Sequence, residues 1–125
     1  MAKGKANPRR RNGSLRDRNA RRLRHEGRPC WICQAFGRAS AIDYSLPARH
    51  PMSFEVDELV PVSKYWLGGY HTPEECANDY SNLAAAHRSC NQWRSNRTVA
   101  EVMAIAARRR SAASREDPLP QPWGL

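Results

Sequence analysis

The sequence predicts one small α+β domain, with a basic segment before it and a helical segment after it. The chain has 125 residues, which is enough for one compact core and too few for two ordinary domains. Residues 54–63 are rich in β-branched and aliphatic side chains, which indicates a strand, and residues 81–97 are expected to contain a short strand or loop followed by a helix. We expect an arm (1–27), a core (28–97) and a C-terminal helix with a proline-rich tail (98–125).

The arm carries the net charge of the chain, which is +9. Residues 1–28 hold eleven of the 21 basic residues but only two of the 12 acidic ones. The arm is predicted to be disordered without a partner, or helical over residues 15–25. A basic arm on a neutral body is typical of nucleic-acid binding, because each phosphate contact releases counterions. The alternative is a solvated tail that aids solubility. We expect Arg9, Arg10 and Arg11 to contact DNA.

The sequence contains no membrane-spanning segment and no signal peptide that we can identify. No apolar run approaches the roughly 20 residues that a membrane span needs, and the N-terminus lacks the apolar core of a signal peptide. We therefore expect a cytoplasmic protein without a membrane partner. In a reducing compartment, cysteines at short spacing more often bind a metal than form disulfides.

Two short motifs have the spacing of metal ligands. They are Cys30-x-x-Cys33 and His87-x-x-Cys90, and 53 residues separate them. Together they would make a closed Cys₃His site of the kind that binds structural zinc, which would stabilise a domain with a small core. The alternative is a surface histidine with buried thiols. Cys76 has no partner at metal spacing and is expected to be a free thiol.

Two adjacent carboxylates, Asp57 and Glu58, interrupt the predicted strand. The strand around them reads as buried, and a buried charge is costly unless it is paired or bound to a metal. Their position therefore indicates a function. The alternative is that they lie on a solvated face of the strand.

A second helix is predicted near the C-terminus. Thr98 and Glu101 form a capping box, which marks a helix start. The apolar face of this helix is expected to hold Val99, Val102, Met103 and Ala106.

Three segments, taken in order, resemble the small zinc-stabilised HNH endonucleases, in particular the short type found in bacteriophages of actinobacteria. The segments are CWIC, FEVDELVPVSK and YSNLAAAHRSCN. The family pattern reads Asp-His-Ile/Val-x-Pro, then Asn-Leu, then Cys/His-x-x-Cys followed by His or Asn. The resemblance covers residues 29–97 and implies a ββα-metal, treble-clef-like fold. For a phage-encoded protein it implies the host bacterial cytoplasm.

The resemblance also implies roles for individual residues. Asp57 would bind the catalytic divalent ion, Glu58 would be the general base, and Asn82 would orient the loop of the base. Asn91 would be the second ligand of the ion, while His87 corresponds to a zinc ligand. Phosphodiester hydrolysis needs a water nucleophile, a proton acceptor and a cation at the leaving oxygen. Carboxylate and amide oxygens suit Mg²⁺ or Mn²⁺.

The sequence departs from the family pattern at Glu58, where a histidine is usual. An exposed glutamate has a pKa of about 4.3 and is a poor base at pH 7, although burial beside Asp57 would raise the pKa. Glu58 is therefore interpreted as a general base, as a metal ligand, or as a sign that the site has lost catalysis and only binds its partner. The spacing of His50 and His71 does not favour either as a substitute base.

Further residues on or beside the helix of Asn91 are expected to contact flanking phosphates. They are Arg88, Arg94 and Arg97. Trp31, Trp66 and Trp93 are assigned to packing.

Two functions fit these features. The first is a metal-dependent DNA endonuclease or nickase, which the resemblance links to phage DNA packaging with the terminase and portal as partners. The second is a non-enzymatic zinc module that binds nucleic acid or a packaging partner.

Overall fold

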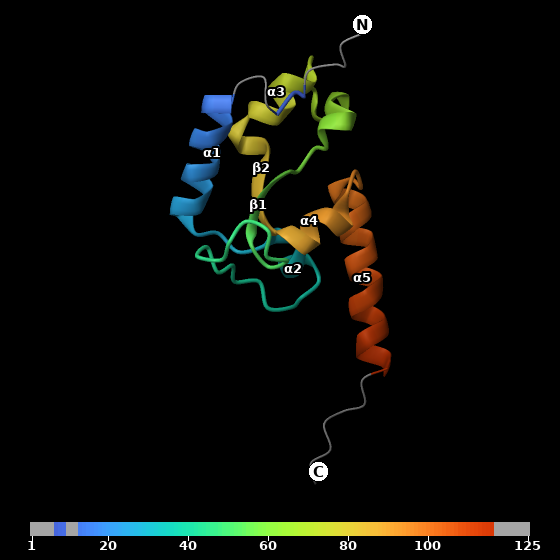
Figure 1. Ribbon diagram of the computed structural model, residues 1–125. Helices are drawn as coiled ribbons and strands as arrows, with labels where there is room; N and C mark the ends of the chain where they lie inside the picture. Colours follow the sequence, from blue (N-terminus) through green and yellow to red (C-terminus); the bar gives the residue numbers. More distant parts are fainter. Residues whose placement is uncertain (1–6, 10–12, 117–125) are drawn as a thin grey trace, which may run out of the picture.

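The computed structural model describes residues 7–9 and 13–116, and among these it contains a two-stranded antiparallel sheet surrounded by helices (Figure 1). This arrangement confirms the α+β prediction. The elements in chain order are α1 (Gly13–Glu26), α2 (Trp31–Ala35), β1 (Phe54–Glu58), η1 (Val62–Gly68), α3 (Pro73–Asn78), η2 (Tyr80–Asn82), β2 (Leu83–His87), α4 (Arg88–Arg94) and α5 (Val99–Glu116). The η elements are 3₁₀ helices.

The two strands pair along their whole length, from Phe54 opposite His87 to Glu58 opposite Leu83. Every residue of β2 is buried. β1 is shorter than the sequence predicts. It ends at Glu58 because the Val60 N–H donates to the side chain of Asn82 at 2.8 Å, and because Pro61 has no N–H to give to a ladder.

Helix α1 shows that part of the basic arm is helical and packed. Leu23 is fully buried, and Asn19, also buried, donates from Nδ2 to the carbonyl of Asn78 in α3 at 3.2 Å. The helix ends at Glu26, and the next residue, Gly27, has a φ of 63°, which favours glycine, and an N–H that bonds back to Leu23. The helical alternative for residues 15–25 is therefore confirmed, while Arg10 and Arg11 lie outside the described residues.

Helix α5 begins at the predicted capping box. Thr98 N–H donates to Glu101 Oε1 at 2.9 Å, and Glu101 N–H donates to Thr98 Oγ1 at 3.1 Å. Val102 and Ala106 are buried, but Met103 is 44% exposed, so its assignment to the apolar face is wrong. Met103 lies about 100° further around the helix than Val102. The C-terminal turns of α5 extend away from the sheet (Figure 1).

The tryptophans differ in their surroundings. Trp31 and Trp93 pack against the buried cluster formed by Cys30, Ile32 and their neighbours. Trp66 in η1 is 59% exposed, which corrects its assignment to packing. No helix among the described residues is both long and apolar enough to cross a membrane.

Candidate metal centre and adjoining cleft

Four predicted ligands come together in the core. The ligand atoms of Cys30, Cys33, His87 and Cys90 all lie within 4.8 Å of one another, and all four residues are buried. Cys33 Sγ lies 3.6 Å from Cys90 Sγ and 3.3 Å from His87 Nδ1. Zn–S bonds of about 2.3 Å in a tetrahedron place two sulfurs about 3.8 Å apart. The cluster therefore fits a tetrahedral metal ion such as zinc.

The fold brings the two halves of this cluster together through the sheet. Cys30 precedes the first residue of α2, and the single turn of that helix brings Cys33 to the same side. His87 is the last residue of β2, and Cys90 lies in the first turn of α4. A strand that leads directly into a helix thus supplies the second half.

The ring of His87 is oriented for metal binding. Its Nε2 lies 3.1 Å from the carbonyl oxygen of Ala41, and because a carbonyl only accepts, Nε2 is the nitrogen that carries the proton. The other nitrogen, Nδ1, faces the sulfurs. This outer hydrogen bond is the usual means of fixing the tautomer of a metal-binding histidine.

Arg38 is a partner of the cluster that the sequence did not indicate. Its Nε donates to Cys33 Sγ at 3.2 Å, and its Nη2 donates to Cys90 Sγ at 3.4 Å. Three thiolates around a divalent ion would leave a net negative charge, which the guanidinium would offset. The Cys90 thiol also hydrogen-bonds Cys30, which lowers the pKa of Cys30 and raises the pKa of Cys90.

Cys76 lies outside the cluster, in a second buried group with Val62 and Ala77. Its thiol is free and donates to the carbonyl of Val60 at 3.2 Å. Burial raises the pKa of Cys76 to about 11, so this thiol stays protonated at neutral pH.

An open cleft of about 940 Å³ is lined by residues of β1, by Asn91 of α4 and by residues of the N-terminal segment. The predicted residues Asp57, Glu58 and Asn91 all line it. Arg9 and Arg16 contribute to the cleft from the N-terminal segment. The cleft thus places two carboxylates and an amide beside guanidinium groups.

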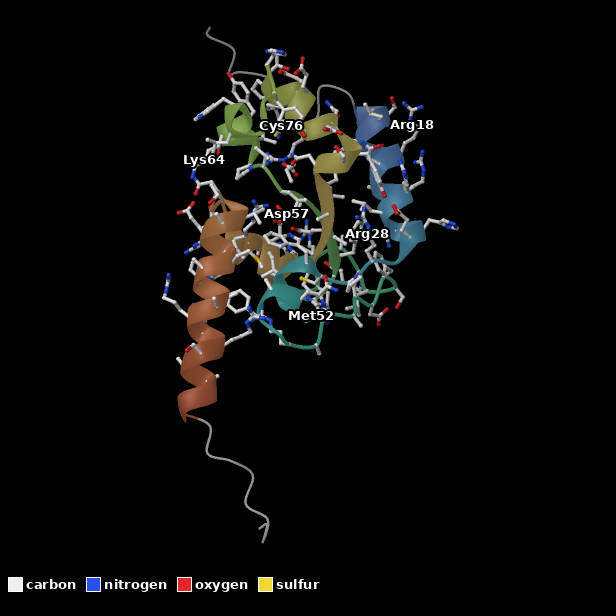
Figure 2. The ribbon with its side chains drawn as sticks, turned by 180° about the vertical axis from the view of Figure 1, so that it is seen from behind. Arg18, Arg28, Met52, Asp57, Lys64 and Cys76 are labelled. Atoms are coloured by element: carbon white, nitrogen blue, oxygen red, sulfur yellow. The ribbon has the colours of Figure 1, made fainter. Side chains whose placement is uncertain are left out.

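Asp57 is buried, which excludes the alternative of a solvated strand face for this residue. Its Oδ2 accepts hydrogen bonds from Trp31 Nε1 at 2.7 Å and from Arg94 Nη1 at 2.8 Å. Burial raises the pKa of Asp57, although the charge of Arg94 and the bond from Trp31 act in the opposite direction. Figure 2 shows Asp57 near the centre of the molecule.

Glu58 is also buried, at 4% exposure, and it is paired. Its Oε1 accepts from Arg9 Nε at 2.6 Å, and its Oε2 accepts from Arg16 Nη2 at 3.3 Å. The arm therefore contributes two arginines to the cleft, one that precedes α1 and one within α1. Neither contact could be inferred from the sequence.

Arg94 does not take the position that the sequence suggested. It is fully buried, and its guanidinium donates to Asp57 and to the carbonyls of Glu58, Leu59 and Arg97. The prediction that Arg94 contacts a flanking phosphate is therefore wrong for this conformation, because none of its surface reaches solvent.

Arg88 and Arg97 keep part of their surface exposed. Arg88 lies 3.5 Å from Glu55 Oε2 and also donates to the carbonyl of Arg49, while Arg97 lies over the ring of Trp93.

Asn82 donates from Nδ2 to the carbonyls of Val60 and Cys76, and these hydrogen bonds fix the position of the loop after Glu58.

Glu55 is a residue of the cleft that the sequence pattern did not single out. Asn91 Nδ2 donates to Glu55 Oε1 at 3.0 Å, and both residues line the cleft. The sequence could have indicated Glu55 through the two-residue period of a strand, which places Glu55 on the same face as Asp57.

Comparisons of this chain with family models, curated proteins and solved structures found no match.

Proposed function

We propose that this chain is a metal-dependent DNA endonuclease or nickase that hydrolyses phosphodiester bonds. The cleft is the observation that supports this proposal, since Asp57, Glu58 and Asn91 line it, and Asn91 directly follows Cys90 of the Cys₃His cluster. The order of β1, β2 and α4 around the cluster also agrees with the resemblance in the sequence. The bound ion of the cluster is proposed to be structural zinc.

Asp57 and Asn91 are the proposed ligands of a catalytic Mg²⁺ or Mn²⁺. Among the described residues, no donor hydrogen-bonds Oδ1 of Asp57. Asn91 uses its Nδ2 to donate to Glu55, so its amide oxygen is the atom that remains for a cation. Such an ion would stabilise the charge on the leaving oxygen of the phosphodiester.

Glu58 is the proposed general base, and its arginine partners must move before it can act. Both oxygens of the paired carboxylate already accept a hydrogen bond from a guanidinium, so neither is free to take a proton from water. DNA phosphates compete for the same guanidinium groups, and Arg9 is 45% exposed. When Arg9 and Arg16 move to phosphates, the Glu58 carboxylate becomes free to accept a proton from water.

The test is cleavage of supercoiled plasmid by zinc-loaded protein with Mg²⁺, Mn²⁺ or EDTA. We expect nicking that requires the divalent ion and falls at least about 100-fold in Glu58→Gln, the size of a general-base contribution. Asn91→Ala should also abolish cleavage, whereas Gln92→Ala, the same truncation at the next and exposed residue, should not.

Asp57→Ala is informative only if it folds, because it leaves the buried charge of Arg94 without its partner. Asn91→Ala avoids this difficulty. Absence of cleavage by a folded, zinc-loaded protein under all these conditions would contradict the proposal.

A second candidate function is a binding module without catalysis. It is favoured by one observation, namely that both carboxylates already have cationic partners within the chain. Such a protein would shift DNA in a gel equally well with Mn²⁺ and with EDTA, and it would leave the DNA intact.

A further inference from the structure

Trp31 lies inside the first half of the metal cluster, between Cys30 and Cys33. It is the first residue of α2, so the two ligands fix the backbone on either side of it. Its Nε1 donates to Asp57 Oδ2 at 2.7 Å. A single hydrogen bond therefore joins the metal cluster to the carboxylate of the cleft.

The second donor to the same oxygen comes from the other half of the cluster. Arg94 ends α4, the helix that carries Cys90, and its Nη1 lies 2.8 Å from Asp57 Oδ2. Its guanidinium also lies over the Trp31 ring, 5.1 Å from the ring centre. Both donors therefore belong to segments that the four ligands bring together.

These two bonds distinguish the oxygens of Asp57. Rotation of the carboxylate would exchange Oδ1 and Oδ2, and two donors on Oδ2 prevent that rotation. Oδ1, which has no donor among the described residues, is then the oxygen left for a cation in the cleft, which Asn91 also lines. Outer partners that orient a metal ligand in this way typically change metal affinity by about 10–100-fold when they are removed.

We propose that Trp31 is a positioning residue, through which the Cys₃His cluster sets the orientation of Asp57 and thereby the affinity of the cleft for a divalent cation. This inference rests on the proposed function, since it takes Asp57 as a ligand of that cation. A purely structural role predicts that the indole matters for its apolar bulk. The positioning role predicts that its N–H matters.

Trp31→Phe separates the two roles, because it keeps an aromatic ring under Arg94 and removes the N–H. Trp93→Phe is the matched control. Trp93 packs edge-on against Phe36 with ring centres 5.5 Å apart, and it is not among the donors to Asp57. Full-length, zinc-loaded proteins are compared, with zinc counted per chain and the melting temperature recorded.

The readout is the affinity for Mn²⁺, measured from the electron paramagnetic resonance signal of free Mn²⁺. We expect Trp31→Phe to weaken Mn²⁺ binding about tenfold or more, at unchanged zinc content, and Trp93→Phe to bind as the wild type does. Equal affinity in Trp31→Phe and wild type would overturn the inference. So would an equal loss in both variants.

A wild-type protein that binds no Mn²⁺ would overturn the proposed function and the claim about affinity together. Hydrogen exchange then decides the remaining claim, that Trp31 holds Asp57. The indole N–H of Trp31 should exchange more slowly than that of Trp66, which is 59% exposed. Equally fast exchange at the two positions would overturn this claim as well.

Discussion

Asp57 shows how β1 accommodates a charged residue in the interior. Its partner Arg94 is fully buried, and the guanidinium also donates to the backbone carbonyls of Glu58, at the end of the strand, and of Leu59, just after it. A buried pair of this kind adds little net stability, but removal of one partner leaves the other charge uncompensated. The two residues should therefore be far more sensitive to single substitution than surface ion pairs are.

Arg94→Ala is expected to lower the free energy of unfolding by about 3–5 kcal/mol, because it leaves Asp57 buried without a counter-charge. Urea denaturation of the zinc-loaded protein measures this change. Arg22→Ala is the control, since the contacts of Arg22 are at the surface, an ion pair with Glu26 at 4.0 Å and a stacking contact with the Tyr80 ring, and each contributes at most about 1 kcal/mol at an exposed site. Equal effects of the two substitutions would contradict the role given to Arg94.

Helix α5 illustrates an element whose start is encoded locally. The capping box involves two residues three positions apart, and its geometry does not depend on the rest of the fold. The amphipathic pattern then places Val102 and Ala106 against the core. An element of this kind depends on tertiary contacts for its packing but not for its first turn.

Thr98→Ala should destabilise the protein by about 1 kcal/mol, because the N–H of Glu101 loses its acceptor. Thr98→Ser keeps the hydroxyl and should restore most of this loss. Thermal unfolding of the three proteins measures the difference. If the alanine and serine variants melt together, the cap is not contributing.

Local signals explain which elements of the site the sequence predicts. The spacing of Cys30 and Cys33 and of His87 and Cys90 is fixed within one turn of chain, so the cluster can be recognised without the structure. The contacts of Trp31, Arg38 and Arg94 cannot, because they depend on which distant segments meet. The position of Arg94 in particular cannot be predicted, because the sequence pattern of a helix is the same whether an arginine faces solvent or a buried carboxylate.

At the scale of the whole molecule, the metal cluster holds together α2, β2 and α4, which bury only a small apolar group between them. Cys30, Cys33 and Cys90 themselves belong to the buried apolar group around Ile32 and Ala86. The remaining buried apolar residues are mostly small. The folded state should therefore depend strongly on the ion.

The purified protein is expected to hold about one zinc per chain, and removal by a chelator should unfold it, because zinc binding contributes to folding directly. Metal analysis and circular dichroism measure the two effects. Cys33→Ser should lose zinc. Cys76→Ser, the same exchange at a buried thiol outside the cluster, should retain it. Acid should release zinc, since protons compete for the thiolates and His87.

DNA binding should depend on the exposed face of α1. Arg18 and Arg21 are exposed, and Figure 2 shows Arg18 at the outer side of the molecule. Replacement of both by alanine is expected to reduce the slope of log affinity against log salt by about 2, because each arginine neutralises about one phosphate. Gln92→Ala removes no charge and is the control, so it should leave the slope unchanged. If the slope were also unchanged in the double arginine variant, the DNA-binding surface would have to lie elsewhere.

The separation of the two halves of the cluster has a consequence during synthesis. Cys33 and His87 are 54 residues apart along the chain. At roughly 5–20 residues per second, the ribosome adds His87 about 3 to 11 s after Cys33. Throughout that interval the first two thiols exist without their partners, and β1 has no strand to pair with. The sheet and the metal site are therefore completed together, only after His87 and Cys90 have been added, and the nascent chain must keep Cys30 and Cys33 reduced until then.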